Sequence, residues 1–310
     1  MKGKTPDKSI LDEVAIEKGI DPAFVEKDWY VTQLIKHISE FSYPGVQLVF
    51  SGGTALSKAH RLIERFSEDI DFRVIWPELE KENGSRQKKL LSKLKNAIFD
   101  HIHQKFPIDE TKKKARDTNR FFTVDIDYST IYKKAIALRP HLQIEFTLSK
   151  MALAPLNCSV SSFVGEVTGQ PAEVTTICCI DPVENAVDKL SAFIWRTADR
   201  ERGTETDDPS IVRHQHDLSI LHDRASKHPS FRDLARKVIE QDKGRSDKIA
   251  AMTLAKMIEH VQDKIKSDPL SREEYDRFVK SMSYAKNEQM PTYEQSFEKV
   301  LSLLKIVGAE

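Results

Sequence analysis

Two short motifs in the first quarter of the chain combine residue types that could bind a nucleotide and a metal ion. The first is the Ser-Gly-Gly-Thr sequence of residues 51–54, which follows an apolar run and precedes a helical pattern. Backbone amides at a glycine turn and at the N-terminus of a helix can receive phosphate groups. The second is Asp69-Ile70-Asp71, where the two-residue period of a β-strand places both carboxylates on one face.

The two carboxylates of the second motif indicate a divalent cation. Unit charges about 4 Å apart repel by roughly 4 kcal/mol at an effective dielectric constant near 20. A bound Mg²⁺ removes that penalty, because it prefers carboxylate oxygens as ligands. A diglycine or an Asp-x-Asp pair by itself usually marks a simple turn or a solvated edge strand. Here both occur in order, joined by an amphipathic helical pattern, and together they predict a phosphate site beside a metal site.

The elements that must position these motifs follow from the periodicity of the apolar residues. Apolar patterns with the period of a strand predict strands at residues 47–50, 68–74, 121–128 and 142–148. Helical spacing predicts helices at residues 10–39 with a break at Asp21-Pro22, at 55–66, at 81–105, and from 182 to the end. Residues 151–180 are expected to be irregular with short strands.

These elements predict an α+β fold in two domains. A chain of 310 residues is longer than a single core usually supports. The change from mixed to purely helical patterns places the boundary near residue 180. We therefore expect residues 1–180 to form a core domain with N-terminal helices and a mixed β-sheet, and residues 181–310 to form a helical domain.

Charge balance and cysteine usage restrict the possible function classes. Lysine plus arginine and aspartate plus glutamate each number 48, so nucleic-acid binding would need a local basic patch. We find neither an apolar run near the roughly 18 residues of a membrane span nor a secretory signal, and we expect a cytoplasmic protein. Cys158, Cys178 and Cys179 are odd in number and two are adjacent, which argues against a disulfide framework or a zinc site and favours packing roles.

The segments around both motifs resemble a known family. Phe50–His60 (FSGGTALSKAH) and Arg65–Phe72 (RFSEDIDF) look like the signature of the AbiEii/AbiGii toxin-type nucleotidyltransferases, which belong to the DNA polymerase β-like nucleotidyltransferase superfamily. Val25–Val31 resembles the family's N-terminal Glu-Lys-Asp-aromatic motif, although an amphipathic packing helix also explains it. The resemblance spans roughly residues 20–300 and implies a polymerase β-like core with a helical domain that contributes to the active-site cleft.

A third carboxylate is expected from a later strand, and two segments qualify. Asp125 and Asp127 form a second Asp-x-Asp pair, whereas Glu145 lies between two apolar residues in the next predicted strand. The residues alone do not separate these alternatives, because both segments present acids on one strand face. The resemblance favours Glu145 over Asp127, since Arg139-Pro140 and the Ile-Glu pair that follows are similar to the family's pattern.

Two segments of the helical domain extend the resemblance. Asp188-Lys189-Leu190 stands where family members carry Glu-Lys-Leu, which implies that Lys189 contacts the nucleoside triphosphate as a point charge. Residues 213–218 look like the family's Arg-His-x-x-Asp-Leu motif. Because Arg213 and Asp217 are four positions apart, both a helix-surface ion pair and an active-site role for Asp217 stay open.

The sequence therefore predicts the following site. The predicted catalytic residues are Asp69, Asp71, Glu145 and Lys189, of which the three acids are also the predicted metal ligands. The predicted nucleotide-binding residues are Ser51, Gly52, Gly53, Thr54, Lys189 and Asp217.

This site predicts a Mg²⁺-dependent nucleotidyltransferase, with one or two metal ions, that transfers a nucleoside monophosphate from a nucleoside triphosphate to a hydroxyl group. The resemblance implies the toxin of a bacterial toxin–antitoxin or abortive-infection system, a cognate antitoxin as partner, and an RNA such as the acceptor end of tRNA, or a protein, as acceptor. The alternative is a catalytically silent nucleotide-binding regulatory or interaction protein of the same fold. Retention of mutually repelling carboxylates argues against that alternative.

Overall fold

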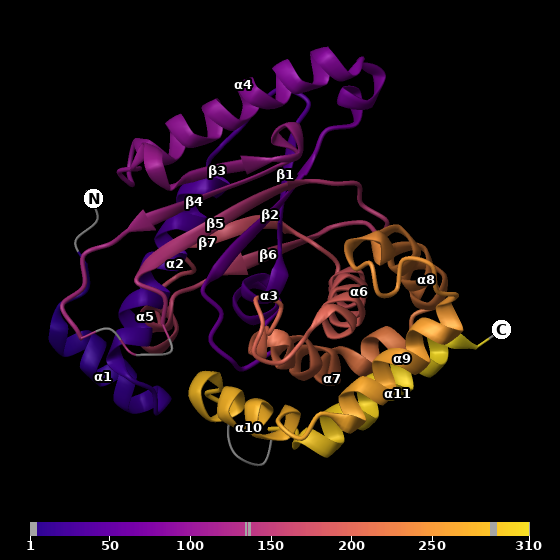
Figure 1. Ribbon diagram of the computed structural model, residues 1–310. Coiled ribbons are helices and arrows are strands. Elements are labelled where there is room, and N and C mark those ends of the chain that lie inside the picture. Colours follow the sequence, from indigo (N-terminus) through magenta and orange to yellow (C-terminus); the bar gives the residue numbers. More distant parts are fainter. Residues whose placement is uncertain (1–4, 134, 136–137, 286–289, 310) are drawn as a thin grey trace. The chain divides into compact units, whose positions relative to one another are not determined.

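The computed structural model describes residues 5–133, 135, 138–285 and 290–309. It divides into two compact units, which are considered separately here. The sheet unit comprises the chain up to Arg61 together with Phe66–Ile180, and the helical unit comprises Leu62–Arg65 together with the chain from Asp181 onward. Figure 1 shows the helices and strands of both units.

The sheet unit contains a seven-stranded mixed sheet with the strand order β3-β4-β5-β2-β1-β7-β6. Its strands are β1 (Gln47–Ser51), β2 (Asp69–Ile75), β3 (Lys113–Arg116), β4 (Phe121–Asp127), β5 (His141–Leu148), β6 (Leu156–Val160) and β7 (Val174–Cys179). The pairs β2/β5 and β1/β7 are parallel, and the other neighbouring pairs are antiparallel. The α+β class with a mixed sheet, expected from the sequence, is confirmed.

The sheet unit contains five α-helices among the described residues. They are α1 (Lys8–Lys18), α2 (Pro22–Ser39), α3 (Gly52–Thr54), α4 (Gly84–His103) and α5 (Phe163–Val167), with shorter turns at Pro77–Lys81, Glu110–Lys112 and Asp117–Asn119. The predicted break between the first two helices is present, because Asp21 caps α2 by accepting a hydrogen bond from the amide of Ala23 at 2.8 Å. Apolar side chains of α2 and α4 share one buried cluster with those of the sheet.

A row of phenylalanines on adjacent strands fixes how the central strands pair. Phe50, Phe72, Phe146 and Phe122 are successive register partners on β1, β2, β5 and β4. Their ring centroids are 5.3, 5.8 and 5.0 Å apart along the row. The row is buried in the core beneath the helices, and the residues next to it in each strand therefore face the opposite side of the sheet.

The helix after the diglycine is shorter than the predicted 55–66 helix. A π-helical turn, η1 (Ala55–Ala59), continues α3 and ends at His60. Arg61 then adopts a φ of 53°, which a right-handed helix does not tolerate. The apolar residues Ile63 and Phe66 are buried as predicted, but in irregular chain rather than on a helix.

The segment 151–180 contains short strands, as expected from the sequence. Its strands β6 and β7 pair antiparallel and extend the sheet beyond β1. The bend between them contains α5, which Ser162 caps by accepting a hydrogen bond from the amide of Gly165. Pro155 directly precedes β6, Gly165 lies in α5, and Gly169 and Pro171 lie between α5 and β7.

The helical unit consists of six longer helices and two short turns in the described residues. They are α6 (Pro182–Asp199), α7 (Val212–Lys227), α8 (Phe231–Asp242), α9 (Leu254–Ser267), α10 (Ser271–Met282) and α11 (Tyr293–Gly308), with turns at Pro209–Ile211 and Lys243–Arg245. The short segment Leu62–Arg65 joins this unit through backbone hydrogen bonds from Tyr284 and Ala285 to the carbonyl of Glu64. The helical pattern predicted from residue 182 onward is confirmed.

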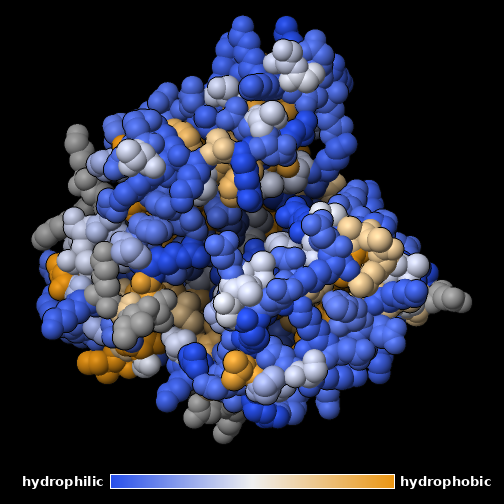
Figure 2. Space-filling view, in the orientation of Figure 1, coloured by the Kyte–Doolittle hydropathy of each residue, from blue (hydrophilic) through white to orange (hydrophobic). Residues whose placement is uncertain are grey.

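No helix among the described residues is long and apolar enough to cross a membrane. The face drawn in Figure 2 is mostly hydrophilic, in keeping with charged residues making up 31% of the chain.

Candidate active site

Three of the predicted carboxylates lie on neighbouring strands of the sheet unit. Asp69 and Asp71 are on β2, and Glu145 is on β5. In the parallel pairing of these strands, Asp71 is the direct register partner of Glu145. Adjacent strands are about 4.8 Å apart, so the backbones that carry these two acids are direct neighbours. All three residues are half-buried, on the side of the sheet opposite the phenylalanine row.

The competing acid, Asp127, lies elsewhere on the sheet. The β4 residue beside Glu145 is Thr123, whereas Asp127 pairs with His141 at the other end of β5. The Asp127 side chain is 72% exposed and forms an ion pair with Lys112 at 2.5 Å. The strand register therefore brings Glu145, and not Asp127, to Asp71.

The first glycine of the diglycine lies directly against the carboxylate of Asp71. Gly52 has a φ of 75°, and a Cβ atom at this position would lie 1.9 Å from Oδ2 of Asp71. Only glycine leaves room for that carboxylate and also adopts this backbone conformation without strain. The two motifs, separated by 16 residues between Gly52 and Asp69 along the chain, thus form one site in the sheet unit.

The two hydroxyl residues that flank the diglycine hold β2 in place. The Thr54 hydroxyl donates to the backbone carbonyl of Asp69, and Thr54 is fully buried. The Ser51 hydroxyl donates to the carbonyl of Asp71 at 3.3 Å. In this structure both side chains bind the acid strand, and their predicted contact with a nucleotide stays a prediction, as it does for the buried Gly53.

An arginine that the sequence did not single out as a site residue reaches the carboxylates. The guanidinium of Arg139 forms an ion pair with the Asp69 carboxylate. The backbone of Arg139 is held by Lys27, whose ammonium donates to the Arg139 carbonyl at 2.7 Å and also pairs with Glu68. Burial lowers the pKa of Lys27, and the neighbouring Glu68 carboxylate opposes this shift.

The N-terminal motif on α2 is therefore a buried charged anchor rather than a purely apolar packing surface. Its next residue, Asp28, accepts hydrogen bonds from the ammonium of Lys58 at 2.5 Å and from the amide of Phe163 at 2.7 Å. Burial raises the pKa of Asp28, and Lys58 opposes that shift. Because Lys58 lies in η1, this ion pair fixes the helical turn that follows the diglycine.

In the helical unit, Lys189 and Asp217 belong to one buried ion cluster. Arg65 donates to both carboxylate oxygens of Asp217, each at 2.7 Å, and the Lys189 ammonium lies 2.8 Å from the same carboxylate. Burial by itself would raise the pKa of Asp217, but Arg65 and Lys189 outweigh it and hold this pKa well below its usual range.

The sequence offered Arg213 as the partner of Asp217, whereas the structure supplies Arg65 and Lys189. Arg65 is 152 positions away from Asp217, so helix spacing gave no signal for this contact. His214, which precedes Asp217 on α7, has no hydrogen-bond partner for either ring nitrogen among the described residues. Burial and the neighbouring Lys189 and Arg213 depress the pKa of His214 well below its usual range.

A strand that enters a diglycine turn, a short helix, and aligned acids on the next strands form an arrangement typical of nucleotidyltransferases. The sequence matches the family described as nucleotidyl transferase AbiEii toxin, type IV toxin–antitoxin system, over residues 35–302. The chain belongs to this family of nucleotidyltransferase toxins.

Comparison with solved structures shows similarity to MenT4, the nucleotidyltransferase toxin Rv2826c from Mycobacterium tuberculosis H37Rv. The two chains share 15% sequence identity, with a TM-score of 0.48, over 95% of this chain and 98% of that chain. No curated protein sequence gave a significant match.

Replacing Gly52 by alanine tests the contact between the two motifs. We expect Gly52→Ala to abolish nucleotidyl transfer and to destabilise the protein, because its methyl group collides with Asp71 in a left-handed backbone conformation. Gly169→Ala is the matched control, with a φ of 66° and nothing within 4 Å of the added methyl group. It should lose only about 1–2 kcal/mol in urea unfolding and keep its activity. Equal effects of both variants would show that the contact is unimportant.

The stability supplied by Asp217 should depend on pH. Because its pKa is lowered in the folded state, the contribution is complete above the unfolded pKa of about 3.9 and is lost as the pH falls through the folded pKa. Asp217→Asn should therefore be about 3–5 kcal/mol less stable than the parent at pH 7, and this difference should shrink below about pH 4. Urea unfolding at pH 7 and pH 3 measures it.

The matched control for this experiment is Asp223→Asn on the same helix. Its carboxylate is 73% exposed beside His222, and we expect no measurable loss of stability. A stability difference for Asp217→Asn that stays constant down to pH 3 would contradict the pKa assignment.

Proposed function

We propose that this protein is a Mg²⁺-dependent enzyme that transfers a nucleoside monophosphate from a nucleoside triphosphate to a hydroxyl group of an RNA or protein acceptor. Pyrophosphate is the second product. The observation that carries the proposal is the position of Asp71, whose carboxylate touches the Gly52 backbone and whose register partner is Glu145. The diglycine turn, which we propose binds the phosphates, therefore lies next to a pair of carboxylates.

The donor set fits a hard divalent cation. Asp69, Asp71 and Glu145 offer carboxylate oxygens, which suit Mg²⁺ far better than a soft metal. These three residues would hold one or two Mg²⁺ ions, which would neutralise the charge of the triphosphate and of the leaving pyrophosphate. The cationic side chain of Arg139 beside Asp69 offsets part of the negative charge of the three carboxylates.

Each residue of the candidate site would have its own role in the reaction. The amides of Gly52 and Gly53 would hold the triphosphate so that the α-phosphorus faces the acceptor. The acceptor oxygen forms a bond to this phosphorus, the bond to the β-phosphate oxygen breaks, and pyrophosphate leaves. Glu145 would help to take the proton of the acceptor hydroxyl. Thr54 would keep Asp69 in position, because its hydroxyl donates a hydrogen bond to the backbone carbonyl of Asp69.

The biological setting follows from the family. A type IV toxin–antitoxin system supplies an antitoxin as a partner. We infer that the enzyme acts in the bacterial cytoplasm, in toxin–antitoxin control or in abortive infection, and that its acceptor is an RNA such as the acceptor end of tRNA, or a protein. A nucleotide-binding protein without transfer activity is the alternative. The proximity of Asp71 and Glu145 argues against it, because a protein that only binds a nucleotide has no need to retain mutually repelling carboxylates.

The carboxylate variants test the mechanism. Purified protein is incubated with each labelled nucleoside triphosphate, Mg²⁺, and bacterial RNA or protein. We expect transfer of label to one macromolecule, and a loss of at least about 100-fold in Asp69→Ala, Asp71→Ala and Glu145→Ala. Asp127→Ala removes an acid that pairs with Lys112 at the other end of β5 and should retain the activity of the parent.

Each outcome of this experiment is decisive. Full activity in Asp71→Ala would disprove the mechanism, and loss of activity in Asp127→Ala but not in Glu145→Ala would assign the third carboxylate to Asp127. The nature of the labelled macromolecule identifies the acceptor class. Absence of label on any RNA or protein would favour the silent alternative.

We also propose that Lys189 binds the triphosphate, as the resemblance implies. Lys189→Met should raise KM for the nucleoside triphosphate about tenfold or more, because a charge-assisted contact is lost, and Lys189→Arg should restore part of it. Asp217 keeps its two bonds from Arg65 in both variants, so the fold should survive. Lys256→Met, at an exposed position of α9, is the control. An unchanged KM in Lys189→Met would remove Lys189 from the nucleotide site.

A further inference from the structure

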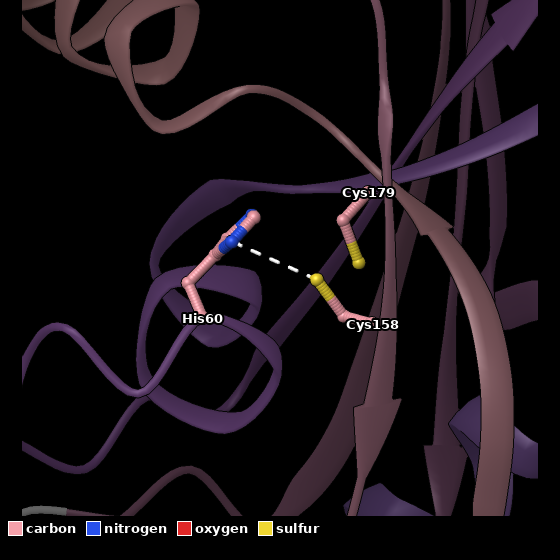
Figure 3. A group of neighbouring side chains, drawn as sticks. All are labelled: His60, Cys158 and Cys179. Atoms are coloured by element: carbon pink, nitrogen blue, oxygen red, sulfur yellow. Dashed lines mark hydrogen bonds between the residues drawn. The ribbon is translucent and has the colours of Figure 1, made fainter.

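Three potential metal ligands from distant parts of the sequence meet inside the sheet unit. They are His60, which follows η1, Cys158 on β6 and Cys179 on β7. One ligand atom of each residue lies within 4.8 Å of those of the other two. Figure 3 shows the imidazole and both thiols pointing toward one another, with Nδ1 of His60 at 3.7 Å from Sγ of Cys158.

The orientation of His60 is that of a ligand. Its Nε2 atom lies 2.8 Å from the backbone carbonyl of Ile180 and, as the donor, carries the ring proton. This hydrogen bond leaves the lone pair of Nδ1 directed toward the thiols. Histidines that bind metals usually donate their other ring N–H to a carbonyl or carboxylate in this way, which fixes the tautomer and the ring plane.

The strand register explains why the two sulfur atoms meet. Cys158 is the partner of Ile177 in the antiparallel pair β6/β7, and Cys179 lies two residues beyond Ile177 on the same face. The neighbouring Cys178 points to the other face, where its sulfur accepts a hydrogen bond from Gln47 at 3.2 Å. The adjacent cysteines of the sequence therefore do not act together, and spacing alone argued against a zinc site.

We propose that His60, Cys158 and Cys179 bind a thiophilic divalent cation of the Zn²⁺ type, with a fourth position open to water or another ligand. Tetrahedral Zn²⁺ with bonds of about 2.0–2.3 Å holds its ligand atoms about 3.4–3.8 Å apart, so the observed cluster needs only a small contraction. A nitrogen and two sulfur donors select this kind of metal, whereas Mg²⁺ prefers the oxygen donors of the carboxylate site. The two sites are chemically distinct, and this inference does not depend on the proposed transferase reaction.

A cation bound by these three residues would link separate elements of the sheet unit. His60 ends the helical segment that begins at Gly52, and the two cysteines lie on the strands at the β6 edge of the sheet. A bound cation would tie this helical segment to β6 and β7. Metal binding would therefore stabilise the segment whose first residue contacts Asp71.

Metal titration of the full-length protein tests the proposal. The reduced protein is stripped with a chelator and titrated with Zn²⁺ against a chromophoric competitor, and separately with Co²⁺. We expect one equivalent to bind and Tm to rise with Zn²⁺ concentration. The Co²⁺ form should show the visible bands of a tetrahedral site and a thiolate-to-metal charge-transfer band.

Variants identify the ligands. Cys158→Ser and His60→Gln should weaken Zn²⁺ binding by more than about 100-fold and remove the Tm shift, because each deletes a direct ligand. Cys178→Ser, which lies beside Cys179 on β7 but on the opposite face of that strand, should bind Zn²⁺ as the parent does, and so should Asp71→Ala in the carboxylate site. Circular dichroism confirms that each variant is folded.

Several results would overturn the proposal. These are an absence of binding by the parent, a Co²⁺ spectrum without thiolate bands, equal binding by Cys158→Ser and the parent, and loss of binding in Cys178→Ser. A disulfide between Cys158 and Cys179 in freshly purified, metal-free protein would also overturn it. None of these measurements uses transferase activity, so failure of this proposal and failure of the proposed function are distinguishable.

Discussion

The row of four phenylalanines across β4, β5, β2 and β1 is the interaction on which the rest of the site depends. Each ring packs on the next at 5.0–5.8 Å, and the row holds four strands in one register. The residues that precede Phe72 and Phe146 in their strands, Asp71 and Glu145, consequently become neighbours on the opposite face. A shift of one residue in either strand would place an acid in the core, so apolar packing enforces the geometry of the carboxylates.

Buried ion pairs of α2 then hold two segments of the candidate site, the one around Arg139 and the turn after the diglycine. Lys27 and Asp28 on α2 have opposite charges and hold different parts of the site. Lys27 positions the segment from which Arg139 reaches Asp69, and Asp28 holds Lys58 in the turn after the diglycine. Buried ions of this kind are costly unless they are paired, so each pair specifies one arrangement of the chain and penalises others.

Local patterns predicted the elements well and the contacts between them poorly. The alternation in residues 69–74, the helix break at Asp21-Pro22 and the helical pattern after residue 182 are local properties, and all are present in the structure. The predicted end of the helix after Gly52 was wrong. The apolar periodicity continues through Phe66, although the backbone leaves the helical conformation at Arg61. The structural partners of Asp217 were also missed, since Arg65 lies far from it in sequence.

The sequence by itself determined the fold class, the acid pair on β2 and the diglycine, because strand period and glycine geometry act over a few residues. Only the tertiary structure decided that Glu145 rather than Asp127 stands beside Asp71, that Asp71 touches Gly52, and that Cys158 and Cys179 converge on His60. The physical reason is that strand register and long-range ion pairing are set by the packing of the whole core. Neither is encoded in the spacing of the residues that they bring together.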